Sequence, residues 1–181
     1  MKVIKKIFDR CFLLQPQIHP DHRGFFFEFY NRKAFLKATG LDMDFVQDNL
    51  ARSRFGVLRG FHFQKPPYEQ AKLVSVIKGK ILDVVVDIRP ESPTFLQHYA
   101  VELNEQNRYQ LFIPKGFAHA YLSLADETYV FYKTDAFYHP QADSGFRFDD
   151  PDVNVNWPID IRRMIVSEKD RNLAFVKDIF G

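Results

Sequence analysis

The chain has little of several things that define other protein classes. It contains 1 Cys, 8 Gly and 1 Trp among 181 residues. The single Cys11 excludes an internal disulfide and a zinc site built from cysteines. No apolar run approaches the roughly 20 residues of a membrane span, and the N-terminal MKVIKKIF lacks the long apolar segment of a signal peptide. We therefore expect a cytoplasmic protein without a membrane partner.

An excess of charge of one sign is also lacking. Lys and Arg number 25 against 23 Asp and Glu, which gives a formal net charge of +2. This balance argues against a nucleic-acid partner and leaves room for a local basic pocket that takes a phosphorylated small molecule. The chain is rich in hydrophobic residues, which make up 46% of it and include 20 Phe. Length and composition predict one globular domain over residues 1–181.

Short runs rich in Val, Ile, Phe and Tyr recur along the chain with turn residues between them. This spacing predicts an all-β antiparallel sandwich or barrel. Lys78 and Gly79, between two apolar runs, predict a tight hairpin turn. A helix is expected over NRKAFLKATG, with Asn31 as N-cap and Gly40 past its end, and short helical turns in the tail. The runs read CFLLQPQI, GFFFEFY, DFVQDNL, GVLRGFHF, AKLVSVI, KILDVVVDI, HYAVEL, YQLFIP, HAYLSL and TYVFYKT.

The stretch GVLRGFHFQ places a titratable imidazole, His62, inside an apolar strand. Strict alternation would point Arg59 and His62 to opposite faces. Glycine within a strand often marks a bulge, and a bulge at Gly60 would turn both side chains toward the barrel interior. The alternative is a core histidine with a satisfied hydrogen bond and a solvated arginine, and this stretch alone favours neither.

A second histidine, His119, follows Pro114 and Gly116 in P-x-G-x-x-H spacing, which resembles the second motif of the cupin superfamily of jelly-roll barrels. The first cupin motif would place H-x-H and then a glutamate, but here Gln64 stands where the second histidine would be. The loss of that imidazole leaves too few nitrogen ligands for a catalytic zinc or iron site. We expect no metal, and a metal-dependent cupin oxygenase stays as a disfavoured alternative.

Eight motifs, in order and over nearly the whole length, resemble the dTDP-4-dehydrorhamnose 3,5-epimerase family. The resemblance implies a cupin-type jelly-roll barrel with a few short peripheral helices. It also implies inversion at C3 and C5 of a dTDP-linked 4-keto-6-deoxy sugar through an enolate, with no cofactor. The motifs are D-x-RGFFFE (21–28), FVQDN (45–49), VLRGFHFQ (57–64), AKLV (71–74), DVVVDIR-x-x-SPTF (83–95), IPKGFAHA (113–120), FYK (131–133) and S-x-KD (167–170).

The resemblance makes His62 the base, Asp170 the carboxylate that orients it, and Tyr132 the proton donor. Spacing alone favours another role for Asp170, because Ser167 and Asp170 have the S-x-x-D pattern of a helix cap. Position alone likewise reads Tyr132 as a core or rim aromatic. A phenol with an ordinary pKa of about 10 suits the donor role, since it stays protonated at neutral pH.

The remaining substrate-binding residues that the resemblance implies are spread over most of the chain. Tyr138 matches a tyrosine that stacks on the base, while Arg59, Lys72 and His119 would face the sugar and its oxyanion. The full set is Arg23, Glu28, Gln47, Asp48, Asn49, Arg59, Lys72, His119, Tyr138, Asp143 and Lys169.

Asp83 and Asp87 share one face of a predicted strand. If that face is inward, both carboxylates need partners, for which Arg59, Arg89 or Lys72 are the candidates. Asp87 is better read as a structural turn with Arg89 at the strand end.

Four positions depart from the usual family pattern: Ala51, Leu96, Ala120 and Asp143, the last in place of a glutamate. They bear on substrate preference and leave the reaction class intact. Two alternatives to the double inversion stay open: an epimerase that inverts only one carbon, and a non-catalytic sugar-nucleotide binding module. Members of the family are dimers with exchanged N-terminal strands, so we expect a homodimer in which Phe26 or a neighbour completes the nucleotide site of the other copy.

Overall fold

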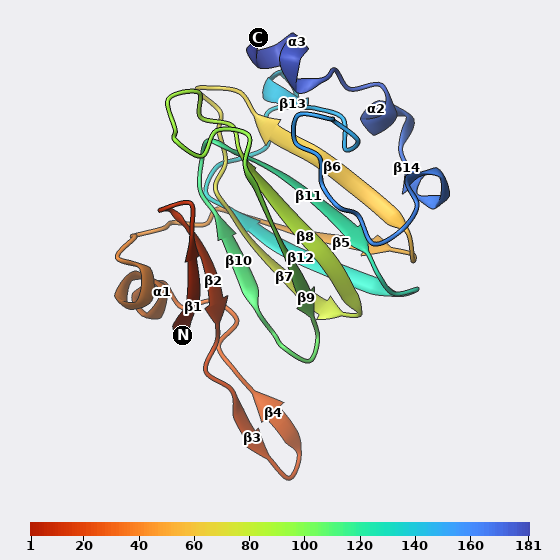
Figure 1. Cartoon of the computed structure of the whole chain (residues 1–181). Coiled ribbons are helices and arrows are strands. Elements are labelled where there is room, and N and C mark those ends of the chain that lie inside the picture. The colour runs from red at the N-terminus through yellow and green to blue at the C-terminus, as the bar shows by residue number, and fades with distance from the viewer.

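The computed structural model describes residues 1–181 as two facing β-sheets with short helices at their edges (Figure 1). Apart from the parallel pair β14–β6, the strand pairs are antiparallel. The first sheet has the order β1 (Lys2–Ile7), β2 (Cys11–Gln15), β10 (Gln110–Ile113), β7 (Lys72–Lys78), β12 (Thr128–Thr134) and β5 (Gln47–Ser53). The second has the order β13 (Asp143–Gly145), β6 (Val57–Gln64), β11 (Phe117–Ser123), β8 (Lys80–Asp87) and β9 (His98–Asn104), with β14 (Ile165–Val166) also beside β6.

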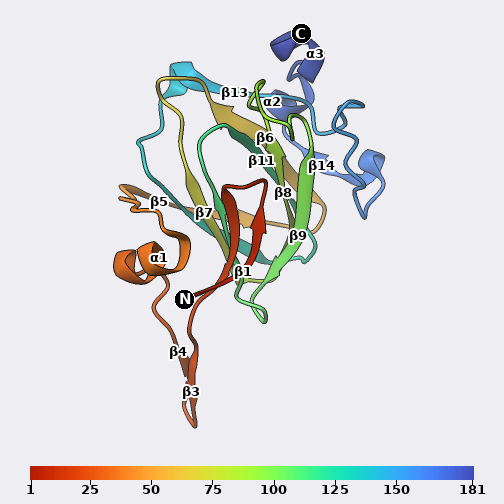
Figure 2. The ribbon, with the colours of Figure 1, turned by 60° about the vertical axis from the view of Figure 1, so that its left-hand side comes forward.

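The main core lies between these two sheets. Side chains alternate along each strand, so every second residue points inward. Val74 and Val130 of the first sheet meet Val85, Leu103 and Tyr121 of the second in one buried cluster. The view in Figure 2 shows the two sheets facing each other. The expected all-β jelly-roll architecture is confirmed.

The outer face of each sheet is covered by a different segment. Helix α1 (Arg32–Thr39) places Phe35 against Phe112 on the first sheet, with ring centroids 5.1 Å apart. The predicted caps of α1 are both present: the Asn31 side chain accepts a hydrogen bond from a backbone amide, and Gly40 adopts a φ of 76°. The C-terminal segment covers the second sheet; its helical elements are η1 (Pro140–Ala142), η2 (Ile161–Arg163), α2 (Glu168–Arg171) and α3 (Val176–Phe180).

Three details of the predicted strands are wrong. Gly79 has the expected positive φ of 80°, but β7 and β8 on either side of it belong to different sheets, so the turn is a crossover and no hairpin. The N-terminal strand β1 was not expected, because its lysines obscure the apolar alternation. The run from Gly24 to Tyr30 forms only the short strand β4 (Gly24–Phe26), which pairs with β3 (His19–Asp21) in a hairpin that projects from the body (Figures 1 and 2).

Helix length bears on the membrane question. The longest helix, α1, has 8 residues. No helix combines the length and apolarity that crossing a membrane requires.

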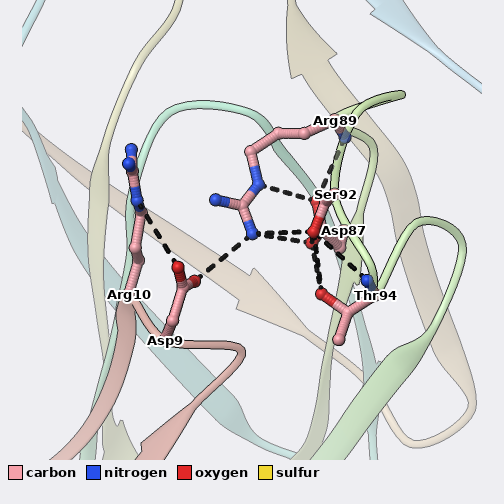
Figure 3. A network of polar contacts seen from close by, with 6 residues as sticks. All are labelled: Asp9, Arg10, Asp87, Arg89, Ser92 and Thr94. Carbon is pink, nitrogen blue, oxygen red and sulfur yellow. Dashed lines mark hydrogen bonds and ion pairs between the residues drawn. The ribbon is translucent and has the colours of Figure 1, made fainter.

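A polar network closes the end of β8, as expected for Asp87 and Arg89 (Figure 3). The Asp87 carboxylate is fully buried and accepts hydrogen bonds from the Arg89 guanidinium (2.7 and 2.9 Å) and from the hydroxyls of Ser92 and Thr94 (2.6 Å each). Arg89 also reaches Asp9, in the turn between β1 and β2, at 3.4 Å. Burial alone would raise the pKa of Asp87, but these hydrogen bonds outweigh it and lower the pKa to about 2.

This network predicts an acid-dependent contribution to stability. Since the folded-state pKa of Asp87 lies below the ordinary 3.8, its contribution is complete above about pH 5 and is lost as pH falls through about 2. At neutral pH, Asp87→Asn should lower the free energy of unfolding by about 2 kcal/mol. Urea unfolding of both proteins from pH 7 to pH 2 should show this difference shrinking toward acid.

Asp160→Asn is the matched control, because Asp160 pairs with Arg162 at the same two-residue spacing on the surface. An exposed pair contributes roughly 0–1 kcal/mol, so this variant should lose far less than Asp87→Asn. A stability difference for Asp87→Asn that is the same at pH 7 and pH 2 would contradict the assignment.

Candidate active site

A polar cavity of about 300 Å³ opens between the two sheets, at the end where β6 and β12 finish and β5 and β7 begin. Eight of the sequence-predicted residues line it: Gln47, Asn49, His62, Lys72, Tyr132, Tyr138, Asp143 and Lys169. Phe63, Gln64, Gln70 and Thr134 complete the lining. The cavity thus brings together residues from both sheets that are as far apart in the sequence as Gln47 and Lys169.

The bulge predicted at Gly60 is present and decides where His62 points. Along β6 and β11, His119 pairs with His62 and Tyr121 pairs with Arg59, so three steps on β6 match two on β11. Because residues two apart on β11 share a face, Arg59 and His62 also share one. That face is the barrel interior, where Tyr121 belongs to the main core.

Asp170 holds the His62 ring from behind. Its Oδ1 lies 2.7 Å from His62 Nε2, and its Oδ2 accepts the Gly60 amide at 3.3 Å. The Ser167 hydroxyl does cap α2 by accepting the Asp170 amide (3.1 Å), but the Asp170 carboxylate does not complete a capping box and turns to the imidazole instead. Burial alone would raise the pKa of Asp170. The hydrogen bond and charge of His62, together with the Gly60 amide, outweigh burial, so the pKa lies below its ordinary value.

This contact fixes the histidine tautomer. An ionised carboxylate can only accept, so His62 Nε2 carries the hydrogen and Nδ1 keeps a free lone pair. The His62 side chain is 31% exposed, because it borders the cavity, whereas Asp170 is nearly covered at 5%. The pair therefore presents one basic nitrogen to whatever occupies the cavity.

Tyr132 reaches the same cavity from the other sheet. It lies on β12, on the face it shares with the core residue Val130, as the alternation predicts. Burial raises the pKa of Tyr132, the neighbouring Tyr121 adds to the shift, and Arg59 opposes it. The phenol thus stays protonated well above neutral pH, opposite the imidazole on β6.

Lys72, at the start of β7, is the cation inside the cavity. Burial lowers its pKa to about 8, against the opposing charges of Asp83 and Asp143. Its ammonium makes neither a hydrogen bond nor an ion pair, in contrast to Lys169 at the mouth, which pairs with Asp143. Lys72 is therefore a partly desolvated positive charge available to an anionic group.

His119 and Arg59 do not line the cavity; His119 is buried, whereas Arg59 is exposed. His119 Nε2 is 2.6 Å from Asp83 Oδ1, so the partner of Asp83 is this histidine and none of the predicted basic residues. Asp83 Oδ2 has no hydrogen-bond partner. Arg59 donates to Ser53 Oγ at 3.3 Å, and that hydroxyl also bonds the Tyr121 phenol at 3.1 Å.

At the cavity mouth, Asp143 joins two of the predicted residues. Its Oδ2 accepts a hydrogen bond from the Tyr138 hydroxyl at 2.9 Å and also contacts the Lys169 ammonium. The hydrogen bond to Asp143 raises the pKa of both Tyr138 and Lys169. Of the four departures from the family pattern, only Asp143 lines the cavity.

Three further predicted binding residues do not line the cavity. Arg23 pairs with Asp21 on the projecting β3–β4 hairpin, where both are exposed. Glu28, just beyond that hairpin, accepts a hydrogen bond from Asn31 at 2.9 Å. Asp48 alternates with Gln47 and Asn49 along β5, so it faces outward and pairs with Lys133.

The sequence interpretation missed Gln64, Gln70, Phe63 and Thr134 as parts of the lining. Strand alternation could have found two of them, since Gln64 follows His62 by two positions and Thr134 follows Tyr132 by two. No cluster of three or more His, Cys, Asp or Glu side chains is arranged to hold a metal ion. The amide of Gln64, at the position of the missing histidine, is bonded to backbone groups at both ends.

The chain is similar in sequence and in structure to several sugar-nucleotide epimerases. A curated dTDP-4-dehydrorhamnose 3,5-epimerase of Methanothermobacter thermautotrophicus is 46% identical over 172 residues, 94% of this chain and 92% of that protein. The Legionella pneumophila dTDP-6-deoxy-D-glucose-3,5-epimerase, solved in complex with dTDP-4-keto-L-rhamnose, matches with a TM-score of 0.92 at 39% identity over 97% of this chain and 93% of that one.

A 3'-monoepimerase from Streptomyces bikiniensis, solved in complex with dTDP-quinovose, is also similar, with a TM-score of 0.86 at 34% identity over 92% of this chain and 83% of that one. The family model for dTDP-4-dehydrorhamnose 3,5-epimerase matches residues 6–178. Together with the facing-sheet fold and the cavity it encloses, these matches show that the protein belongs to the dTDP-4-dehydrorhamnose 3,5-epimerase family.

Proposed function

We propose that the protein converts dTDP-4-dehydro-6-deoxy-D-glucose to dTDP-4-dehydro-L-rhamnose by inverting C3 and C5. The observation that carries the proposal is the Asp170–His62 pair on one wall of a cavity that has Tyr132 on the other. Both carbons are α to the C4 ketone, so each C–H bond can break to give an enolate. This chemistry needs a base, an acid on the opposite face and a positive charge at the oxyanion.

His62 Nδ1 is the base in this proposal. It takes the proton from C3, and the electron pair of the C–H bond moves into the C4 enolate. Asp170, kept ionised by its lowered pKa, stabilises the imidazolium that forms. Tyr132 then delivers its phenolic proton to the other face of the carbon, since it stands on the opposite sheet. Both groups regain their starting state by exchange with water at the open mouth.

Lys72 is the group that stabilises the enolate oxygen. A base contributes on the order of 100- to 10,000-fold, so the oxyanion must be stabilised as well. The Lys72 ammonium meets this need because it is partly desolvated and has no ion-pair partner. The buried pair of His119 and Asp83 and the guanidinium of Arg59 do not line the cavity, and the proposal gives them no part in the proton transfers.

The nucleotide occupies the outer part of the cavity in this proposal. Tyr138 is half exposed there and offers a flat ring for stacking on thymine, and Lys169 offers charge to the diphosphate. Asn49 Nδ2 is a buried donor without a partner, which a sugar or base oxygen would satisfy.

We further propose a homodimer in which the β3–β4 hairpin of each copy completes the site of the other. An isolated two-stranded hairpin is marginally stable in water, and this one exposes Phe25 (55%) and Phe26 (67%). The turn at its tip carries Arg23, and Glu28 follows its second strand; neither residue lines the cavity of its own copy. A second copy would cover the phenylalanines and receive Arg23 at its cavity mouth.

The roles of base and acid predict different defects. In heavy water with dTDP-4-keto-6-deoxyglucose, the wild type should place deuterium at both C3 and C5 of the inverted product. His62→Ala should lose exchange and inversion by about 100- to 10,000-fold. Tyr132→Phe should still exchange, because His62 can return the proton to the same face, but it should not invert. Mass spectrometry and NMR of the product separate these outcomes.

His98→Ala is the control, because His98 bonds the Val153 carbonyl and does not line the cavity. This variant should leave both deuterium exchange and inversion unchanged. Exchange at one carbon only would move the assignment to a single-site epimerase. Binding of TDP without any exchange would reduce the protein to a binding module.

The lowered pKa of Lys72 predicts an alkaline limb in the pH profile. Lys72 is charged below about pH 8 and neutral above it, so kcat/KM should decline as pH rises through about 8. Lys72→Met should cost about 100- to 1,000-fold and lack this limb, whereas Lys72→Arg should move the limb upward. Steady-state rates from pH 6 to 10 test this, and an unchanged limb in Lys72→Met would rule out Lys72 as its origin.

Subunit mixing tests the shared site. Arg23→Ala and His62→Ala should each be nearly inactive alone. In a mixed dimer, however, the subunit with intact His62 receives an intact Arg23 from the other, so co-expression should restore about a quarter of the wild-type activity. No recovery would show that Arg23 does not act across the interface, and a monomeric mass in solution would exclude the dimer.

A further inference from the structure

The loop of residues 135–142, between β12 and β13, carries Tyr138 to the cavity mouth. Three glutamine side chains that line the cavity, each from a different part of the sequence, bond the backbone of this loop. The three bonds join Gln47 Oε1 to the Tyr138 amide (3.1 Å), Gln64 Oε1 to the His139 amide (2.7 Å) and Gln70 Nε2 to the Ala136 carbonyl (2.8 Å).

Gln64 connects this loop to a second one. Its Nε2 donates to the Tyr68 carbonyl at 3.0 Å, in the loop between β6 and β7, while its Oε1 serves His139. The rings of Tyr68 and His139 stack with centroids 3.8 Å apart and planes 20° apart. Gln64 is 7% exposed, so both of its bonds are shielded from water. One buried amide thus holds two loops together beside the catalytic pair.

Two other side-chain contacts reach the middle of the 135–142 loop: the Thr134 hydroxyl also donates to the Ala136 carbonyl, and the Tyr138 hydroxyl donates to Asp143, each at 2.9 Å. Further contacts fasten its ends. Near its start, the Asp135 carboxylate accepts the Ala71 amide at 2.7 Å. Near its finish, the Lys65 amide donates to the Ala142 carbonyl at 2.9 Å. Between these two points, Phe137 and Tyr138 are 71% and 50% exposed. The middle of the loop therefore has little apolar burial to order it, and the glutamines supply three of the four side-chain hydrogen bonds to its backbone.

The amide group at position 64 satisfies both of these loops. The two partners of Gln64 are a backbone amide N–H and a backbone carbonyl oxygen, so the residue must accept at one end and donate at the other. A glutamate would point a carboxylate oxygen at the Tyr68 carbonyl, and a leucine would leave both backbone groups unpaired. The residue lies two positions after His62 on β6, so the same strand face provides the base and the anchor.

We propose that Gln64 and Gln70 are positioning residues that hold the 135–142 loop, and with it Tyr138, in the conformation that receives the nucleotide. The inference rests on the proposed function in so far as it takes the ligand to be a thymidine diphosphate sugar. A loop ordered before binding spares the ligand the entropy cost of ordering it. Loss of the anchors should weaken binding and leave the chemical step unchanged, since His62, Asp170 and Tyr132 lie on other elements.

The test compares Gln64→Leu and Gln70→Leu with the wild type in three measurements. Amide hydrogen exchange of the unliganded protein should rise about five- to ten-fold across residues 136–139. Calorimetry with TDP should show a Kd raised about ten-fold. Kinetics with the dTDP-4-keto-6-deoxy sugar should show KM raised by a similar factor and kcat within about two-fold.

Gln15→Leu is the matched control, because Gln15 on β2 also reaches the backbone of a loop, at Asn107, at the other end of the barrel. It should leave all three readings unchanged. Unchanged exchange in residues 136–139 of Gln64→Leu would overturn the inference, as would a fall in kcat as large as the rise in KM. A wild-type protein that neither binds TDP nor reacts would overturn the proposed function, and the exchange measurement would still decide whether the glutamines hold the loop.

Discussion

The site depends on one constraint, the close approach of Gly60 to the neighbouring strand. A Cβ at this position would lie 2.6 Å from Ala120 Cα, Ala120 Cβ and the His119 carbonyl oxygen, and the backbone has a φ of 123°. Only glycine tolerates both. The bulge that results brings His62 to the interior face, and it directs the Gly60 amide at Asp170. The same residue therefore aims the base and helps to hold its carboxylate.

The two-sheet architecture supplies the second requirement of the proposed chemistry. Inversion at a carbon requires proton removal on one face and delivery on the other, and facing sheets are a direct way to place two groups on opposite sides of a ligand. His62 belongs to the second sheet and Tyr132 to the first. Neither residue is on a loop, since β6 and β12 are each bonded to neighbours on both sides. The loops carry only the groups that contact the outer part of the cavity.

Features encoded by local sequence were predictable, and features that depend on long-range packing were less so. The caps of α1 and the bulge at Gly60 follow from single residues whose conformational preferences are strong. The turn at Gly79 shows the limit: its positive φ was predictable, but whether the next strand pairs with the last or crosses to the other sheet depends on the whole barrel. The Asp83–His119 contact was missed for the same reason, because it joins residues on β8 and β11 whose pairing no local pattern reveals.

Asp170 shows why a structural and a functional interpretation of one motif need not compete. The spacing from Ser167 predicts a cap, and Ser167 does bond the Asp170 amide. A helix of only 4 residues has few other bonds to hold it, so the cap fixes the position of Asp170. In a capping box the carboxylate would turn back to the backbone of its own helix. Here it turns to the imidazole and the Gly60 amide, so the hydroxyl orders the turn and leaves the carboxylate free for His62.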